Sequence, residues 1–580
     1  MKQTVAKHKQ VPRSQRRGRV QRTLVRARLV RDGILSVAPR QMPGRVAGMH
    51  RRAVAVIEVV GTNFTLCSAD DRETLVAGYQ ALLKALPPQH ALQILIRRQT
   101  RDLSHYRERL LTVAQDETAP PAYRALAEAH AAHVDQLGVD RTLFDTRCYV
   151  IVSAQDEQQA SSLTRFLSRR RHKTRERSHE ALRMALNIQS ERLLTHLSNM
   201  GLAAHRLDDD ALVHLAASCL APARAECFPL APATIASLAP HSLLPLPDLI
   251  APSAVVEQPE YLIVEGEYLR NVVVTGYPRE VMTGWLAPLL SHDDLLDISF
   301  HIHAQHPAVV LRRFRRRKAE LRASKRLATR RGWVDDPDDA VATGDIERLL
   351  TQVASREEAL AEVGLYLQVR APDLATLDER TERLMSVLKN LLLVAHPATF
   401  EHLHAWQAMQ PLADDALWRT ALLDTRSLAT TFPFASNTLS MPGGVLEGVT
   451  ATGEPVLIDD WADELDNAHR FIGAITGAGK SYYCKLKIMR ELVLRYFEGL
   501  QIAVIDPERE YERLCHKLGG TMVHLSPGSP QHLNPFDLIP QGIPFAAYLA
   551  DSVHGDRLAE KVLSLHALYD LMLSDRGPTD

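Results

Sequence analysis

Residues 474–481, with the sequence Ala-Ile-Thr-Gly-Ala-Gly-Lys-Ser, combine the groups that bind a chain of phosphates. Gly477 and Gly479 let backbone N–H groups turn inward without a Cβ atom in the way, and a helix start adds the positive end of its dipole. Lys480 is suited to bridge two phosphates, and the Ser481 hydroxyl to bind Mg²⁺. The sequence predicts a site for ATP and Mg²⁺ formed by Ala474, Ile475, Thr476, Gly477, Ala478, Gly479, Lys480, Ser481 and Tyr482.

The pattern departs from the usual phosphate-binding loop at its first position. Counting back from Lys480, the first glycine of such loops falls at Ala474, and Gly473 lies one residue too early. This position lies at the end of the preceding strand and touches the phosphates least. We therefore expect alanine to be tolerated there.

A phosphate loop needs a strand before it and a helix after it. The apolar run at residues 470–475 predicts the strand, and residues 480–498 predict the helix. Gly499 is a natural end for this helix because glycine readily takes the left-handed conformation.

Carboxylates follow the next apolar run. Residues 501–505 predict a central parallel strand, and Asp506, Glu508 and Glu510 come directly after it, where open α/β sheets place their ligands. Glu510 is our first candidate for positioning the attacking water, and Asp506 is the second. The alternative is that these acids cap the next helix. A further strand is predicted at residues 521–525.

The composition sets wider limits. A chain of 580 residues with 46% apolar residues has room for two to four domains. Its 69 Lys and Arg balance 69 Asp and Glu, so an argument for a nucleic-acid or membrane partner must be local. Six cysteines without a Cys-x-x-Cys pair fit single thiols in a reducing compartment. No secretory signal is recognised, and five prolines exclude a membrane helix at residues 228–247.

Residues 1–50 predict a basic, flexible arm, since no acid precedes Asp32. The arm could contact anionic lipid or nucleic acid, or remain a solvated tail.

Alternating strand and helix patterns then predict an α/β fold with two βαβ-type units, at residues 51–226 and 257–430, joined by a Pro-rich linker at residues 227–256. Matched points in the two units lie 215, 206 and 217 residues apart (276 minus 61, 305 minus 99, 371 minus 154), which suggests a repeat, with convergent patterning as the alternative.

Two polar features of the second unit have open interpretations. The helix predicted at residues 309–331 carries many arginines, which could meet DNA phosphates or an acidic neighbouring subunit, or form a solvated face. His301 and His303 alternate on one strand face with no third ligand nearby, so we expect core or surface histidines rather than a metal site.

The phosphate loop is one of eight sequence motifs that follow one another along the chain. They are IEVVGTNFTLCS, VVVTGYPREVMTGWLAPLL, TFPFAS, GGVLEG, GAGKSYY, AVIDPEREYERL, LGGTMVHLSPGS and NPFDL. In these motifs the chain resembles the conjugal-transfer ATPases of type IV secretion systems, the VirB/TrbE/TraC-like group. The resemblance covers nearly all of the chain after the basic arm.

The resemblance implies the first part of a RecA-like P-loop ATPase domain at residues 431–580. It implies a cytoplasmic motor, peripheral at the inner face of the cell membrane, that forms hexamers and acts with other subunits of the secretion channel. Such a motor would hydrolyse ATP to energise assembly of the channel or pilus and transfer of DNA or protein.

A RecA-like motor also needs a second strand ending in Asp-Glu downstream of the loop. Nothing after Asp506 supplies it, and the similar PVLIDDW at residues 455–461 precedes the loop. The sequence therefore predicts a motor domain without its C-terminal part and little hydrolysis by this chain alone. The alternatives are a DNA-translocating ATPase of the HerA/FtsK kind, or an inert scaffold.

Overall fold

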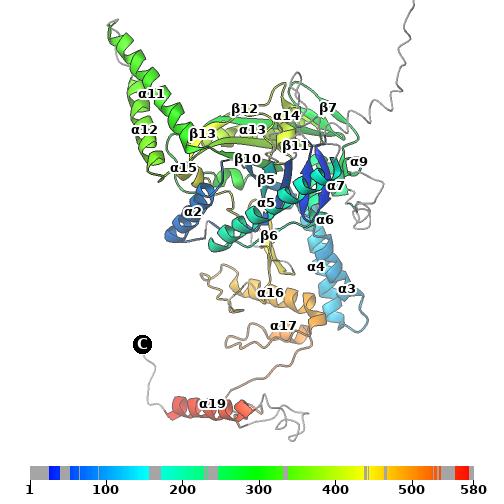
Figure 1. Ribbon diagram of the computed structural model, residues 1–580. Coiled ribbons are helices and arrows are strands. Elements are labelled where there is room, and N and C mark those ends of the chain that lie inside the picture. Colours follow the sequence, from blue (N-terminus) through cyan, green and yellow to red (C-terminus); the bar gives the residue numbers. More distant parts are fainter. Residues whose placement is uncertain are drawn as a thin grey trace, which may run out of the picture. The chain divides into compact units, whose positions relative to one another are not determined.

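The computed structural model describes residues 25–38, 52–64, 66–88, 91–155, 171–227, 230, 246–330, 337–436, 440–441, 443–462, 465, 467–526, 528–531, 534–536 and 555–573. The chain divides into two compact units, each taken by itself below (Figure 1). The first comprises the described residues up to Arg107 and from Ala132 to Arg470. The second comprises Glu108–Ala131 and the described residues from Phe471 onward.

The first unit is built on a sheet of thirteen strands. Their bounds are β1 (Ala27–Arg31), β2 (Ile34–Val37), β3 (Arg52–Val59), β4 (Ala91–Thr100), β5 (Phe144–Gln155), β6 (Ala204–Arg206), β7 (Val255–Glu257), β8 (Leu262–Val264), β9 (Glu267–Gly276), β10 (Leu296–Ala304), β11 (Leu360–Ala371), β12 (Val394–Pro397) and β13 (Ala421–Asp424). The main order is β1-β2-β3-β5-β4-β10-β11-β9-β8-β7, while β6 pairs with β3, β12 with β9 and β13 with β11. Every ladder of this sheet is antiparallel.

Helices connect and cover these strands. Their bounds are α2 (Ala69–Lys84), α3 (Ser104–Gln115), α4 (Pro121–Asp140), α5 (Arg171–Asn199), α6 (Asp209–Leu220), α7 (Pro222–Cys227), α9 (Leu246–Ile250), α10 (Ala287–Leu290), α11 (Pro307–Arg330), α12 (Pro337–Ala354), α13 (Leu374–Asn390), α14 (His402–Ala408) and α15 (Thr425–Ala429). A separate hairpin of β14 (Val445–Val449) and β15 (Pro455–Ile458) follows them.

The two halves of the sheet share one topology. In the first half, β3, β4, β5 and β6 occur in the chain as strand, helix, strand, strand, helix, strand, and the spatial order is β6-β3-β5-β4. In the second half β9, β10, β11 and β12 repeat that order. Each half is thus a split βαβ arrangement. The βαβ-type units expected from the sequence would pair β3 with β4 and β9 with β10. This pairing was wrong, because β5 lies between β3 and β4, and β11 lies between β9 and β10.

Strand registers relate the halves residue by residue. Ala53 pairs with Ala154 in the first half, and Tyr268 pairs with Ala371 in the second, giving separations of 215 and 217 residues (268 minus 53, 371 minus 154). Two of the three separations read from the sequence match these offsets. The third is 204 rather than 206, because Leu92 and Leu296 take equivalent places opposite β5 and β11.

Side chains on both faces of the sheet are buried, which explains the nearly continuous apolar runs in its central strands. On one face, leucines of α5 and α13 pack with alternate residues of β3, β4, β10 and β11. On the other face, α6, α9 and α14 cover the intervening residues. The unit therefore has three layers, with the sheet in the middle.

A buried polar seam joins the halves where β4 pairs with β10. Arg97 lies opposite Asp297 and forms an ion pair of 3.2 Å with it. Gln93 lies opposite His301, its amide donates to the Ser299 hydroxyl at 2.9 Å, and the His301 imidazole is 2.8 Å from the carbonyl of Ala408. A shift in register would leave these buried polar groups without partners. The seam therefore fixes the register in which β4 and β10 pair.

We predict an acid-sensitive contribution of His301 to stability. Burial lowers the pKa of His301 to about 4, so the unfolded chain binds a proton more readily than the folded one below pH 6.5. The stabilisation is complete above about pH 6.5 and is lost as the pH falls toward 4, by up to ~1.4 kcal/mol per pH unit. His301→Gln should flatten this dependence in urea unfolding between pH 4 and 7. The exposed His404→Gln, as a control, should not, and equal profiles for the two variants would refute the prediction.

The expected basic arm contains a folded hairpin. β1 and β2 pair across a turn at Asp32 and Gly33, both with positive φ, and β2 pairs with β3. Leu35 and Val37 are buried in the core. An Asp-Gly pair between alternating apolar residues is a hairpin signal that the surrounding arginines concealed. Residues 1–24 and 39–51 lie outside the described part of the chain.

Residues 280–290 have a helical pattern in the sequence, but most of them do not form a helix. Only α10 is helical there, because Gly284 has a φ of +74° and donates its N–H to the carbonyl of Thr430 at 2.9 Å. A Cβ atom at this position would lie 2.8 Å from the Phe64 ring. Glycine is thus required by both conformation and space.

The end of the expected linker is folded, since α9 and β7 lie within residues 246–257. The rest of the uncharged stretch at residues 228–247, apart from residue 230, and the helix expected at residues 157–167 lie outside the described residues. Among the helices that the structure describes, none has both the length and the apolar character needed to cross a bilayer.

Candidate nucleotide-binding loop

The predicted phosphate loop lies in the second unit and is open to solvent. Gly477 and Gly479 have φ values of +83° and +94°, which glycine adopts without strain. A Cβ atom at either position would meet nothing within 4 Å. The N–H of Ala478 donates to the carbonyl of Ile475 at 3.1 Å and closes a turn. The loop therefore has the backbone conformation and the free space that a phosphate chain needs.

The loop leads directly into α16 (Lys480–Leu494), as the motif requires. Gly479 is the N-cap in the left-handed conformation and provides no side-chain cap, so the N–H groups of the first turn remain available to an anion. Lys480 and Ser481 occupy this first turn. A short 3-10 helix (Tyr496–Glu498) follows α16, and Gly499 ends it in the left-handed conformation, which confirms the predicted stop.

The C-terminal end of α16 is anchored by buried contacts within the second unit. Val493 is buried, and the Glu491 carboxylate accepts hydrogen bonds from Arg495 at 3.0 Å and Lys487 at 3.1 Å. The ring of Tyr496 packs against Tyr123, which belongs to the same unit. The helix is thus held at the end opposite the phosphate loop, so its first turn is free to receive a ligand.

Asp506 closes the turn before the next helix and does not act as its N-cap, which is Tyr511 without a side-chain cap. One carboxylate oxygen accepts the N–H of Glu510 at 3.1 Å, and the other accepts the N–H of Tyr511 at 2.8 Å, just before α17 (Glu512–Lys517). Arg509, at the centre of this turn, has a φ of +59°. Glu510 and Glu508 are exposed. Their part in placing water, like that of Asp506, stays a prediction.

Tyr511 links the carboxylate segment to α16. The ammonium group of Lys485 lies 5.2 Å from the centre of the Tyr511 ring. Burial, followed by the neighbouring Cys484 thiol, raises the pKa of the Tyr511 phenol. Cys484 and Lys485 lie one turn beyond Ser481, so these contacts hold the segment of Glu510 against the first turns of α16. Sequence reasoning missed Tyr511, because a tyrosine in a charged helix start has no distinctive pattern.

The three strands predicted around the loop are not formed. Residues 470–475, 501–505 and 521–525 have no ladder partners among the described residues, and the side chains of Phe471 and Ile505 are 95% and 97% exposed. An apolar run becomes a buried parallel strand only where neighbouring strands pair with it and helices cover it. In the described part of the second unit these partners are not in place. α19 (Gly555–Leu573) lies beyond these segments.

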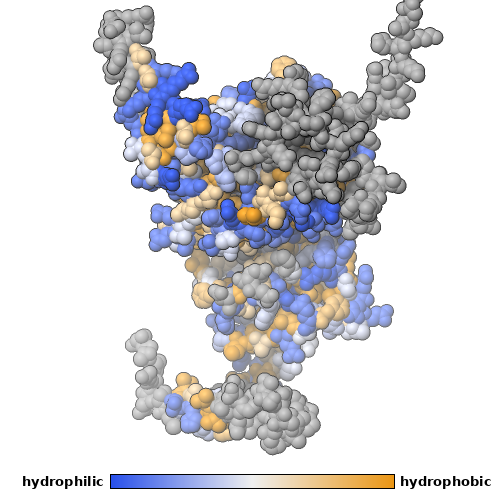
Figure 2. Space-filling view, in the orientation of Figure 1, coloured by the Kyte–Doolittle hydropathy of each residue, from blue (hydrophilic) through white to orange (hydrophobic). Residues whose placement is uncertain are grey.

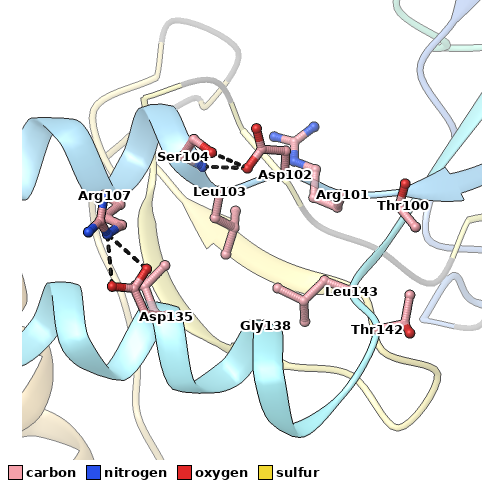
Figure 3. A pocket seen from close by; sticks show the side chains of 11 residues that line it. Thr100, Arg101, Asp102, Leu103, Ser104, Arg107, Asp135, Gly138, Thr142 and Leu143 are labelled. Carbon is pink, nitrogen blue, oxygen red and sulfur yellow. Dashed lines mark hydrogen bonds and ion pairs between the residues drawn. The ribbon is translucent and has the colours of Figure 1, made fainter. Parts of the chain in front are cut away.

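A separate concavity of about 300 Å³ lies in the first unit at the base of α3 and α4 (Figure 3). Several of its polar groups bond to one another. Arg107 and Asp135 point toward each other with a closest approach of 2.8 Å, and Asp102 accepts the N–H of Ser104 at 2.8 Å. We assign these groups to anchoring the helix pair, because none is left free to bind a ligand.

The histidines of β10 serve the fold. His301 is buried in the polar seam, and His303 stacks on Trp418 with ring centres 4.6 Å apart. Within the residues that the structure describes, no group of three or more His, Cys, Asp or Glu could hold a metal ion.

Comparison with known proteins places the loop in a family context. Residues 448–548 match the family model described as "Helicase HerA, central domain". No curated protein matches the chain. Families of this type are P-loop ATPases related to the VirB- and TraC-like transfer ATPases. The matched region contains the predicted phosphate loop at residues 474–481.

Proposed function

We propose that this protein is the ATP-binding subunit of a translocating motor of the HerA type. The observation that carries the proposal is the open loop at residues 474–481 within the matched region. Backbone N–H groups of Gly477 to Ser481 and the Lys480 ammonium would hold the phosphates, and Ser481 would bind Mg²⁺. ATP hydrolysis would supply the free energy for moving a polymer, with DNA as the first candidate because the matched family is described as a helicase.

The family also suggests how the motor is assembled. HerA-type ATPases typically form hexamers. We propose a ring in which a neighbouring subunit completes each nucleotide site, while Glu510 helps to position the attacking water. Tyr511 would keep Glu510 near the loop through its contacts with Cys484 and Lys485.

The proposal is tested by coupling between nucleotide and DNA. The affinity of a translocating motor for its polymer must change with the nucleotide state. A non-hydrolysable ATP analogue with Mg²⁺ should therefore change the Kd for duplex DNA about fivefold or more. By reciprocity, DNA should change the Kd for the analogue by the same factor. Lys480→Ala should abolish the coupling. Equal DNA affinity with and without a bound analogue would contradict a translocating motor.

A second candidate is a motor of a type IV secretion system, in line with the resemblance of the motifs. What favours it is the extent of the first unit, because those motifs run through both of its halves. The full chain should then bind the membrane subunits of a secretion channel, and Lys480→Ala should leave this binding unchanged. Failure to recover any channel subunit would count against this candidate but not against the HerA-type motor.

A further inference from the structure

The two halves of the sheet carry helical insertions at equivalent points of the chain, and the insertions have opposite charge. In the first half, α3 and α4 connect β4 to β5, and in the second, α11 and α12 connect β10 to β11. The α3–α4 pair has three Lys and Arg against four Asp and Glu, a net formal charge of −1. The α11–α12 pair has eleven against five, a net charge of +6. The strong positive charge is thus a property of the second insertion and is not shared by the first.

The basic helix stands away from the sheet. α11 and α12 lie side by side and extend outward (Figure 1), and strongly hydrophilic residues cover much of this helix pair (Figure 2). An apolar cluster fixes the base of the pair, where Val310 packs with Val353 and Leu360 beside Phe314.

The charges on the described part of α11 are engaged to different degrees, since Lys318 pairs with Glu347 of α12 at 2.6 Å and Arg313 with Glu362 of β11 at 3.1 Å. Arg312 and Arg315 are exposed and form no ion pair among the described residues. The Arg316 side chain is 84% exposed and bonds only to Glu320 of its own helix, at 3.1 Å. Exposed pairs of this kind contribute about 0–1 kcal/mol, so phosphate oxygens can replace the carboxylate at little cost.

The amino-acid composition of α11 favours binding to a phosphate backbone over binding to other acidic partners. Eight of its ten basic residues are arginines, whose planar guanidinium binds phosphate through two parallel hydrogen bonds. A membrane-surface helix needs an exposed apolar face, whereas Val309 is the only large exposed apolar side chain among the described ones on α11. Phe314 is engaged in the apolar cluster, so stacking on bases is not available.

We infer that the basic face of α11 binds the phosphate backbone of DNA without regard to sequence, outside the nucleotide site. This inference rests on the proposed function in its choice of polymer, and it adds a surface that guides the DNA from the first unit. Binding should not need ATP, and it should weaken steeply as salt rises because phosphate contacts release counterions.

The test uses the full chain and a labelled 30-base-pair duplex of arbitrary sequence, by fluorescence anisotropy between 50 and 200 mM salt. The double variant Arg312→Gln and Arg315→Gln should reduce the slope of log Kd against log salt by about 2 and raise Kd roughly 10- to 100-fold near 100 mM salt. Arg312→Lys with Arg315→Lys should keep the slope. The matched control, Arg192→Gln on α5 with Lys389→Gln on α13, removes the same charge and should behave as wild type.

Three results would overturn the inference. The first is no duplex binding by the wild type at 50 mM salt, and the second is equal binding by the arginine double variant and the control pair. The third is a loss of binding to vesicles of phosphatidylcholine and phosphatidylglycerol without a loss on DNA, which would assign α11 to a membrane surface. Lys480→Ala separates this site from the motor, because it should bind the duplex as wild type in the absence of nucleotide.

Discussion

Replacing Lys480 by alanine is expected to raise the Kd for a fluorescent ATP analogue in the presence of Mg²⁺ roughly 10- to 150-fold. Lys480 lies in the first turn of α16, directly after the open turn of Gly477 and Gly479. A hydrogen bond from an ammonium group to a phosphate contributes about 1.5–3 kcal/mol, which corresponds to the stated range of Kd. Equilibrium titration of the purified chain measures it.

Two further variants separate the loop from the rest of the helix. Gly479→Val should weaken binding as strongly, because valine at a φ of +94° strains the turn and its side chain enters the space in front of the N–H groups. Lys487→Ala removes a lysine from the same helix, where it is bonded to Glu491, and should leave the Kd unchanged. Equal affinity of the Lys480 and Lys487 variants would exclude a phosphate site at the loop.

Asp297→Ala is expected to destabilise the first unit by about 3–5 kcal/mol, the largest effect on stability that we predict. The Arg97 side chain is 1% exposed, and it bonds to the hydroxyl and carbonyl of Ser218 as well as to Asp297. Without the carboxylate, the buried guanidinium at the junction of β4 and β10 would lose the counter-charge of Asp297. Urea unfolding followed by tryptophan fluorescence measures the loss, since Trp406 is buried in the same core as α6.

Two controls identify the cause. Arg97→Met combined with Asp297→Leu removes both charges and should recover most of the lost stability, because well-packed apolar residues can replace a buried ion pair. Asp135→Ala breaks the exposed pair with Arg107 and should cost about 1 kcal/mol or less. A double variant as unstable as Asp297→Ala would show that packing, and not the unpaired charge, governs the junction.

Local patterns were sufficient to predict the glycine turn before α16 and most central strands. The Gly-Ala-Gly-Lys-Ser turn depends only on residues next to each other, and the structure shows the glycine conformations that the motif requires. The central strands β3, β4, β10 and β11 were recognisable because both of their faces are buried, so that their apolar runs are nearly continuous.

Features that depend on distant residues could not be predicted. The insertion of β5 between β3 and β4 leaves no local signal, since it is decided by pairing between strands far apart in the chain. The break at Gly284 is set by Thr430 and Phe64, which are likewise remote. Tyr511 is brought to α16 by the fold alone. In the second unit, the runs at residues 501–505 and 521–525 have the composition of buried strands, but composition does not supply their partners.

The difference in charge between the two helical insertions could be recognised only from the sequence and the structure together. The arginines of α11 were evident in the sequence, yet a solvated helix face was the favoured explanation for them. The repeated topology supplies the comparison, because α3 and α4 occupy the equivalent place without a positive charge. The structure therefore favours a binding role for the arginines of α11, which the sequence alone had left open.

A structure of the chain with Mg²⁺ and a non-hydrolysable ATP analogue tests the central claim most directly. We predict that the β- and γ-phosphates lie within hydrogen-bonding distance of the N–H groups of residues 477–481, with the Lys480 ammonium in contact and the Ser481 hydroxyl bound to Mg²⁺. An intact fold with an empty loop at saturating analogue would contradict the proposal that this protein is an ATP-driven motor.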